Sequence, residues 1–360
     1  MGLEVSPDPE ELEVSLFGPG VGEAIAVHLG GGSWMLVDSC INSATGVPAS
    51  AQYLAQLGVP TEKVKLIVGT HWHDDHMRGL ADLVDTYPDA RFFCTPILKD
   101  GDFHAFVPGG STRMLTSAGT SELAKVLDVF DDRQVRTGRN PMLVWPDRLL
   151  WQEGADWVRS LSPSDTGVRE FLDQMTAVYP AAGDAKSRVS TIRPNETSVV
   201  LWIEVGDGVV LLGADLEHRA NPLLGWGAIL ASHLRPQRRA DVFKVPHHGS
   251  ATGHDQELWD EMLVSGPIAV LTPFARSGLP RAEDVNRICA LASEAYITAP
   301  LAPGKVRRRV STVTKTIEGA VRYLREAEPP TGHIRLRKQR SSGAPWSVEL
   351  FLPAASLCNP

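Results

Sequence analysis

The feature that most constrains the fold of this chain is the six-residue run 71–76, which contains three histidines and two aspartates. It directly follows the apolar segment 64–68, which has the length and composition of a buried β-strand. Imidazole nitrogen is a favoured ligand for zinc, and carboxylate oxygen suits zinc or manganese. A solvated polar loop is the alternative interpretation, but the whole chain has only 11 histidines. The run therefore predicts a metal site at the end of a strand.

Length and composition indicate a folded soluble protein. With 360 residues the chain has room for two modest domains or one large α/β unit with insertions, and we expect the latter. Residues 1–13 carry five acidic residues and no basic one, the opposite of a secretory signal. The longest apolar stretch, 198–216, is interrupted by Glu204 and by Gly206 to Gly208, so we expect two strands there and no membrane span.

The four cysteines, at positions 40, 94, 289 and 358, show no CxxC spacing. The absence of CxxC pairs argues against zinc bound by sulfur and against a dense disulfide scaffold. We therefore expect a protein of the reducing cytoplasm.

Basic residues are concentrated near the C-terminus. Residues 301–340 contain eleven Lys or Arg against three Glu, although the whole chain has a net charge of -8. Such a segment attracts phosphate-bearing ligands or forms a solvated face. The residues that we consider for phosphate contact are Arg307, Arg308, Arg309, Arg335, Arg337, Lys338 and Arg340.

Short strands and glycine-rich turns open the chain, and strands then alternate with helices. The expected strands are 12–17, 24–29, 33–37, 64–68, 91–94, 198–205, 209–213, 241–245, 268–272, 333–337 and 346–350. The expected helices are 49–57, 121–130, 164–178 and 281–295. We expect an insertion over the site at about 100–190, and a terminal hairpin. This order predicts a mixed sheet covered by helices.

Three motifs resemble the metallo-β-lactamase superfamily. The signature H-x-H-x-D-H is matched by His71, His73, Asp75 and His76. The segment 213–215, G-A-D, resembles the motif of the metal-bridging aspartate, and 244–250, K-V-P-H-H-G-S, resembles the last histidine motif. Together with N-E-T-S at 195–198, these motifs look most like the ComEC-like branch. The resemblance covers residues 12 to about 298.

The resemblance implies an α/β fold, an αββα sandwich in which two mixed β-sheets are covered by helices. It also implies a catalytic domain over residues 1–300, with the insertion at about 100–190. Residues 301–360 are then a basic C-terminal extension that ends in the hairpin and packs on the same domain.

The resemblance also implies the ligands of two divalent ions, with zinc favoured over manganese. His71 and His73 hold one ion, Asp75 and His76 hold the other, and Asp215 bridges them. One of His247 and His248 completes the second ion; we favour His247, and we assign His248 with Asp75 to catalysis. Three further residues are expected to contact substrate: Asn195, Lys244 and Ser250. Asp74 and Asp38 are candidates for orienting a ligand imidazole.

One departure from the family pattern concerns the first ion. The superfamily often has a further histidine about twenty residues before the bridging aspartate, but residues 177–214 contain none. Asn195 lies in that neighbourhood. His104 is the only histidine between His76 and Asp215 that could replace the missing ligand. The departure weakens the first metal site.

The implied activity is hydrolysis by a metal-bound hydroxide, because a bound divalent ion lowers the pKa of water from 15.7 to about 7. The expected substrate is a phosphodiester in nucleic acid, a nucleotide or a phosphorylated small molecule, and no membrane partner is expected. A lactonase or thioesterase, or a metal-binding module without activity, remains the alternative. The sequence has no serine elbow or phosphate loop to supply another chemistry.

Overall fold

The computed structural model describes residues 5–95, 122, 125–130, 132, 140–178, 194–300, 330–341 and 343–358. The statements below concern these residues. Much of the expected insertion lies outside them, as do His104 and Arg307 to Arg309.

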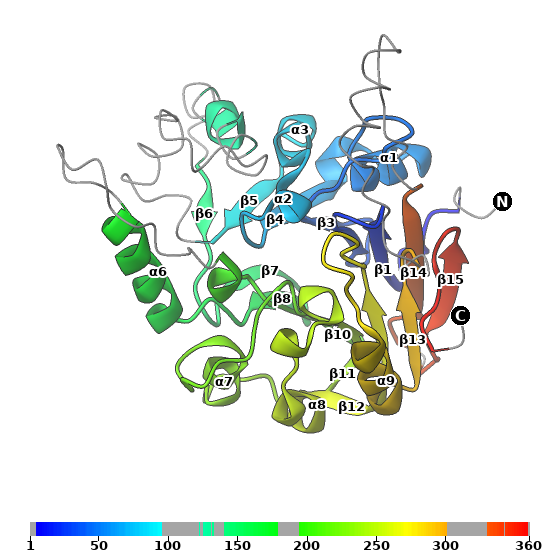
Figure 1. Ribbon diagram of the computed structural model, residues 1–360. Coiled ribbons are helices and arrows are strands. Elements are labelled where there is room, and N and C mark those ends of the chain that lie inside the picture. Colours follow the sequence, from blue (N-terminus) through cyan, green and yellow to red (C-terminus); the bar gives the residue numbers. More distant parts are fainter. Residues whose placement is uncertain are drawn as a thin grey trace, which may run out of the picture.

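Two eight-stranded sheets packed face to face form the centre of the molecule (Figure 1). The first has the order β15-β14-β1-β2-β3-β4-β5-β6, and the second has the order β16-β13-β12-β11-β10-β9-β8-β7. The strands of the first sheet are β1 (Glu11–Gly18), β2 (Ala24–His28), β3 (Trp34–Val37), β4 (Val64–Gly69), β5 (Arg91–Cys94), β6 (Met142–Leu143), β14 (Gly332–Gln339) and β15 (Ser347–Phe351). Those of the second are β7 (Leu149–Glu153), β8 (Asp156–Ser160), β9 (Leu201–Val205), β10 (Gly208–Leu212), β11 (Ala240–Lys244), β12 (Leu263–Leu271), β13 (Glu294–Ile297) and β16 (Ala355–Ser356).

Each sheet is antiparallel in one part and parallel in another. Strands β3 to β6 run parallel to one another, and so do β10 to β13. The carboxyl ends of parallel strands meet at one edge of a sheet, where the loops that follow them collect functional side chains. The mixed sheets predicted from the order of elements are confirmed.

Helices cover both outer faces of the sandwich (Figure 1). Those on the first sheet are α1 (Ala49–Gln56) and α3 (Leu80–Thr86), and those on the second are α7 (Gly225–Leu230), α8 (Gln256–Met262) and α9 (Ala282–Leu291). Further helical segments are α2 (Asp74–Met77), α6 (Asp165–Val178), η1 (Thr61–Lys63), η3 (Pro194–Thr197), η4 (His247–Gly249) and η5 (Ala251–Gly253). The predicted αββα sandwich is confirmed. No helix among the described residues combines the length and the apolar character needed to cross a bilayer.

Strand β1 is buried on both of its faces, one apolar and one polar. Leu12, Val14 and Leu16 alternate along it and pack between the sheets. The opposite face carries Glu13, whose side chain is fully buried but accepts hydrogen bonds from Tyr53 Oη on α1 and from Arg337 Nε, both at 2.7 Å. Burial of this charge is tolerated because hydrogen bonds and an opposite charge satisfy it.

The C-terminal strands belong to the first sheet, since β14 pairs antiparallel with both β1 and β15. Four basic residues there, which we considered for phosphate contact, are instead used within the fold. Their acidic partners are Glu349 for Arg335, Glu13 for Arg337, Asp241 for Lys338 and Asp156 for Arg340. The sequence did not reveal these pairs because the acidic partners lie far from the basic residues along the chain or on the next strand.

The helix expected at 281–295 is shorter than predicted. It ends at Leu291, and Glu294–Ile297 forms strand β13. Ala295 and Ile297 alternate as buried residues and join the parallel part of the second sheet, so tertiary pairing overrides the continued helical pattern.

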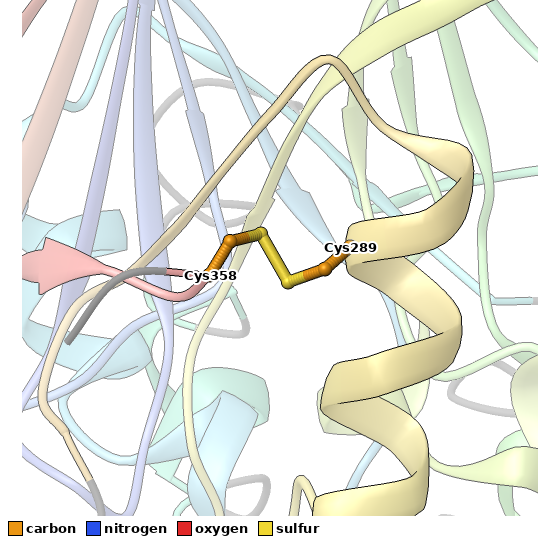
Figure 2. The surroundings of a disulfide bond; sticks show 2 residues. All are labelled: Cys289 and Cys358. Atoms are coloured by element: carbon orange, nitrogen blue, oxygen red, sulfur yellow. A yellow bond between two sulfur atoms is a disulfide. The ribbon is translucent and has the colours of Figure 1, made fainter.

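A disulfide bond joins Cys289 of α9 to Cys358 near the C-terminus, across a sequence separation of 69 residues (Figure 2). Cys40 and Cys94 are free and buried. The cysteine spacing did not predict this bond. Because disulfides persist mainly in oxidising compartments, the bond weighs against the reducing cytoplasm that we expected.

Replacing both bonded cysteines by serine is predicted to lower the free energy of unfolding by about 4 kcal/mol, because the closed loop of 69 residues no longer restricts the unfolded chain. Urea unfolding measures the difference. Dithiothreitol should lower the stability of the wild type to that of the double variant and leave the variant unchanged. A wild type indifferent to reductant would contradict the bond.

Stability is also predicted to fall in mild acid because of His28. Its Nδ1 lies 2.8 Å from Glu11 O, and its Nε2 accepts a hydrogen bond from Gly32 N at 3.0 Å, so the ring is satisfied only when neutral. Burial lowers the pKa of His28 to about 4. The unfolded chain therefore takes up this proton first as the pH falls below about 6.5, which costs about 3 kcal/mol of stability by pH 4.

Urea unfolding between pH 7 and pH 4 tests this contribution against His28→Gln, whose amide donates and accepts but does not titrate. The variant should lose less stability than the wild type over this range, since all other titrating groups are shared. Equal losses would show that His28 is not responsible.

Candidate metal centre

Loops that follow three parallel strands converge at one edge of the sandwich. Strand β4 leads into residues 70–76, β10 leads to Asp215, and β11 leads to His247 and His248. The backbone is left-handed at Asp38, after the neighbouring strand β3, and at Ala214, His247 and His248, with φ angles of 55°, 45°, 49° and 53°. Such left-handed backbone is costly for residues other than glycine and is concentrated at functional sites.

Four side chains form the larger group of candidate ligands: Asp75, His76, Asp215 and His248. One ligand atom from each lies within 4.8 Å of all the others. His248 Nε2 is 3.0 Å from Asp75 Oδ2, and His76 Nε2 is 3.4 Å from Asp215 Oδ1. All four side chains are at most 9% exposed, so little water reaches them.

A second group consists of His71, His73 and Asp215. His71 Nε2 lies 3.9 Å from Asp215 Oδ2, and the rings of His71 and His73 are 4.9 Å apart. Asp215 is common to both groups, which is the position expected of a bridging carboxylate. The structure therefore brings together six of the residues singled out from the sequence.

Three buried atoms in these groups have no hydrogen-bond partner: His71 Nε2, His76 Nε2 and Asp215 Oδ1. A buried polar atom without a partner is expensive and rare in native proteins. Two imidazole nitrogens and a carboxylate oxygen that face one another are a donor set for zinc or manganese. The residues therefore fit a divalent metal ion.

Buried oxygen acceptors orient the ligand imidazoles. His76 Nδ1 lies 2.7 Å from Asp38 Oδ2, and Asp38 is itself held by the backbone N–H and the hydroxyl of Thr70, each at 2.7 Å. His248 Nδ1 lies 3.1 Å from Thr272 O. Such contacts point the other ring nitrogen toward a metal. Asp38 therefore orients His76.

Lys244 is expected from the sequence to contact substrate, and the structure contradicts this. Its side chain is fully buried beneath the site. Its Nζ lies 2.7 Å from Glu23 Oε1, 2.9 Å from Ala214 O and 3.8 Å from Asp215 Oδ1. The ammonium group thus compensates two buried carboxylates and holds the turn that carries Asp215. Sequence reasoning missed Glu23, although a lysine inside an apolar strand requires such a partner.

The electrostatics of the groups follow from burial and neighbouring charges. Burial, together with the neighbouring His76, holds the pKa of His71 well below its ordinary value. Burial also favours a lower pKa for His76. The carboxylates of Asp215, Asp75 and Asp38 outweigh this effect, so the pKa of His76 is raised. For Asp215 the burial effect is outweighed by His248, His76 and Lys244, which hold its pKa well below the ordinary range. The carboxylate shared by both groups is therefore ionised.

The positions of His247 and His248 are the reverse of those expected. His248 lies in the larger group, its side chain is 2% exposed, and its ring stacks on Phe274 with centroids 5.2 Å apart. His247 belongs to neither group; its Nδ1 lies 3.1 Å from Glu217 Oε1. The left-handed turn at both residues sends their side chains in different directions, which the strand pattern does not reveal.

Asn195 and Ser250, the other residues expected to contact substrate, lie beside His247. Asn195 Nδ2 is 3.2 Å from Glu217 Oε1 and 3.4 Å from His247 Nε2, while its Oδ1 is buried without a hydrogen-bond partner. Ser250 Oγ accepts from Thr252 N and caps a short helical turn. Sequence reasoning missed Glu217, which lies only two residues after the G-A-D motif.

Comparison with known proteins agrees with the site. The family model described as the metallo-β-lactamase superfamily matches residues 17–135, which include the H-x-H-x-D-H motif. No curated protein matches the chain.

Solved structures give more distant likenesses. The metallo-β-lactamase fold protein YhfI from Bacillus subtilis is 14% identical with a TM-score of 0.42, and the match covers 81% of this chain and 96% of that one. A metallo-β-lactamase from Cronobacter sakazakii is also 14% identical, with a TM-score of 0.36 and coverage of 66% and 78%. Because these scores are low, the assignment rests on the matched segment and on the ligand groups that the fold assembles. Over residues 17–135 the chain is therefore similar to the metallo-β-lactamase superfamily, and the fold adds groups of candidate metal ligands to that likeness.

Proposed function

We propose that this protein hydrolyses phosphodiester bonds with two divalent cations, zinc or manganese, held at the candidate metal centre. The observation that carries the proposal is the set of buried, unpartnered ligand atoms, His71 Nε2, His76 Nε2 and Asp215 Oδ1. An ion at each ligand group would satisfy all three, since His76 belongs to the larger group, His71 to the smaller and Asp215 to both. His76 Nε2 and Asp215 Oδ1 lie 3.4 Å apart without hydrogen-bond geometry, which suits two ligands of one ion.

The two ions would be held unequally. Asp75, His76, Asp215 and His248 offer one ion four ligand atoms, whereas His71, His73 and Asp215 offer the other only three, one of them shared. Asn195, in the neighbourhood of the missing histidine, has only its amide oxygen to offer. We infer a tight site at the larger group and a weaker one at the smaller.

Bound divalent ions would lower the pKa of water and stabilise negative charge on the phosphoryl oxygens. The protein residues keep this arrangement rigid. Asp38 fixes the orientation of His76, and Thr272 fixes that of His248. Lys244 holds the turn of Asp215 through Ala214 O. We assign Asn195 and His247, whose side chains lie together beside the smaller group, to contact with the substrate.

A phosphodiester is favoured over an acyl ester by two features of the sequence. The motifs at 195–198 and 244–250 resemble the ComEC-like branch, and residues 301–329 retain seven Lys or Arg after the four paired basic residues of β14 and the turn that follows it are set aside. Phosphate-bearing substrates are attracted to such a segment. We further propose that residues 1–300 form the catalytic domain and that the C-terminal strands complete its two sheets, because β14 pairs with β1 and β16 pairs with β13.

Metal titration of the purified protein with a competing chromogenic chelator is predicted to show two steps of different affinity. His248→Ala should weaken the tight step by at least about a hundredfold, because it removes a ligand rather than a residue that only orients one. His71→Ala should weaken only the weaker step.

His247→Ala is the matched control, since it removes the neighbouring imidazole outside both ligand groups, and both steps should then change by less than about tenfold. If His247→Ala abolished the tight step while His248→Ala preserved it, the assignment of the two histidines would be reversed.

Asp75→Ala and His76→Ala are each predicted to lower hydrolysis of bis(p-nitrophenyl) phosphate by more than about a hundredfold, because the charge stabilisation at the reacting centre is lost. The metal-loaded wild type should prefer this diester to p-nitrophenyl acetate and to a lactone. Circular dichroism checks that the variants are folded. Unchanged rates in both variants would exclude the assigned roles, and a preference for the lactone would exclude the phosphodiester.

A further inference from the structure

A small cavity adjoins the metal centre on the side of Asp75. It has a volume of about 100 Å³, and its charged lining residues are two carboxylates, Asp74 and Asp75, and two arginines, Arg78 and Arg276. Asp75 also belongs to the larger ligand group, where its Oδ2 lies 3.0 Å from His248 Nε2. The cavity and the candidate reaction centre are therefore separated by a single side chain.

The backbone around this cavity is held in place on each side. The β1–β2 loop is tied to the metal centre through Glu23 N, which donates to Asp75 O at 2.8 Å, and to the loop after β12 through Ala275 N, which donates to Gly20 O at 2.9 Å. Gly22, with φ +118°, forms part of the lining; a Cβ there would lie 2.9 Å from Cys40 Cβ. A larger residue at Gly22 would therefore collide with Cys40.

Arg276 sits on a tightly braced turn. Phe274 N donates to Leu279 O at 2.9 Å, Leu279 N donates to Phe274 O at 3.2 Å, and the ring of Phe274 stacks on His248. Arg276 itself is exposed, and it has no hydrogen-bond or ion-pair partner in the part of the chain that the structure describes. The braced turn fixes the backbone position of Arg276, and the planar fork of its guanidinium matches the oxygens of a phosphate.

We propose that this cavity binds a second anionic group of the substrate, a phosphate next to the phosphodiester that is cut, and that Arg276 is its main recognition residue with Arg78 in support. The inference rests on the proposed function and deepens it: the substrate carries at least two phosphates. Asp75 belongs to the larger group of candidate ligands, so Asp74 is the one other carboxylate of the lining, against the two arginines.

The phosphate would belong either to a terminal monoester or to the next diester of a strand, and both present the same oxygens to an arginine. A set of thymidine oligonucleotides separates these sources. TpT has only the diester, pTpT and TpTp add a terminal phosphate at either end, and TpTpT adds a second diester. The measured quantity is kcat/KM of the metal-loaded enzyme for each, relative to TpT.

The wild type is expected to favour at least one of the three phosphate-bearing substrates over TpT by at least about tenfold, since hydrogen bonds to charged groups contribute in this range. Arg276→Gln should bring that ratio close to one. Arg169→Gln is the matched control, because it removes an exposed arginine of α6 that does not line the cavity and should leave the ratio unchanged. A wild-type ratio near one, or an equal ratio in wild type and Arg276→Gln, would overturn the proposal.

A binding measurement separates failure of the cavity from failure of the proposed function. If the wild type hydrolyses none of these diesters, the phosphodiesterase assignment fails, and calorimetry with pTpT, TpTp and TpT then judges the cavity alone. Binding of pTpT or TpTp that is at least tenfold tighter than binding of TpT, and that loses this advantage in Arg276→Gln, would support the cavity. Equal affinities for the three ligands would overturn it.

Discussion

The carboxylate of Asp215 is the point on which the rest of the site depends. It is 2% exposed, and it is shared by both groups of candidate ligands. A buried negative charge is tolerated only when opposite charges and hydrogen-bond donors surround it. His76, His248 and Lys244 approach it from three sides, with contacts of 3.4, 3.6 and 3.8 Å. Even so, Oδ1 remains without a hydrogen-bond partner, and a metal ion would complete its surroundings.

The αββα architecture explains how such a concentration of charge is held. The central strands of each sheet are buried on both faces, and the candidate ligands gather on the loops at one edge. Ala214 and His248 adopt left-handed backbone there, and His247 N donates to Ala214 O at 3.1 Å, which joins the loops after β10 and β11. The apolar core therefore stabilises the strained turns that bring the ligands together.

Lys244 and the basic residues of β14 illustrate how sequence position misleads about function. Each was considered for substrate or phosphate contact because cations attract anions. In the fold, Lys244 compensates Glu23 and Asp215 from below, and Arg337 compensates Glu13 on the neighbouring strand. Charged residues in strands that are buried on both faces are internal counter-charges, whereas Arg276, on an exposed turn, keeps its charge available.

The sequence by itself determined the α/β sandwich, the approximate position of most strands and most of the residues of the candidate metal centre. These features are local, because an apolar run followed by a histidine motif is recognised without knowing which residues pack against it in the fold. The tertiary structure alone decided that His248 and not His247 joins the larger ligand group, that Cys289 meets Cys358, and that Glu23 and Glu217 belong beside the site. These outcomes depend on left-handed turns and on contacts between residues far apart along the chain, so no local pattern encodes them.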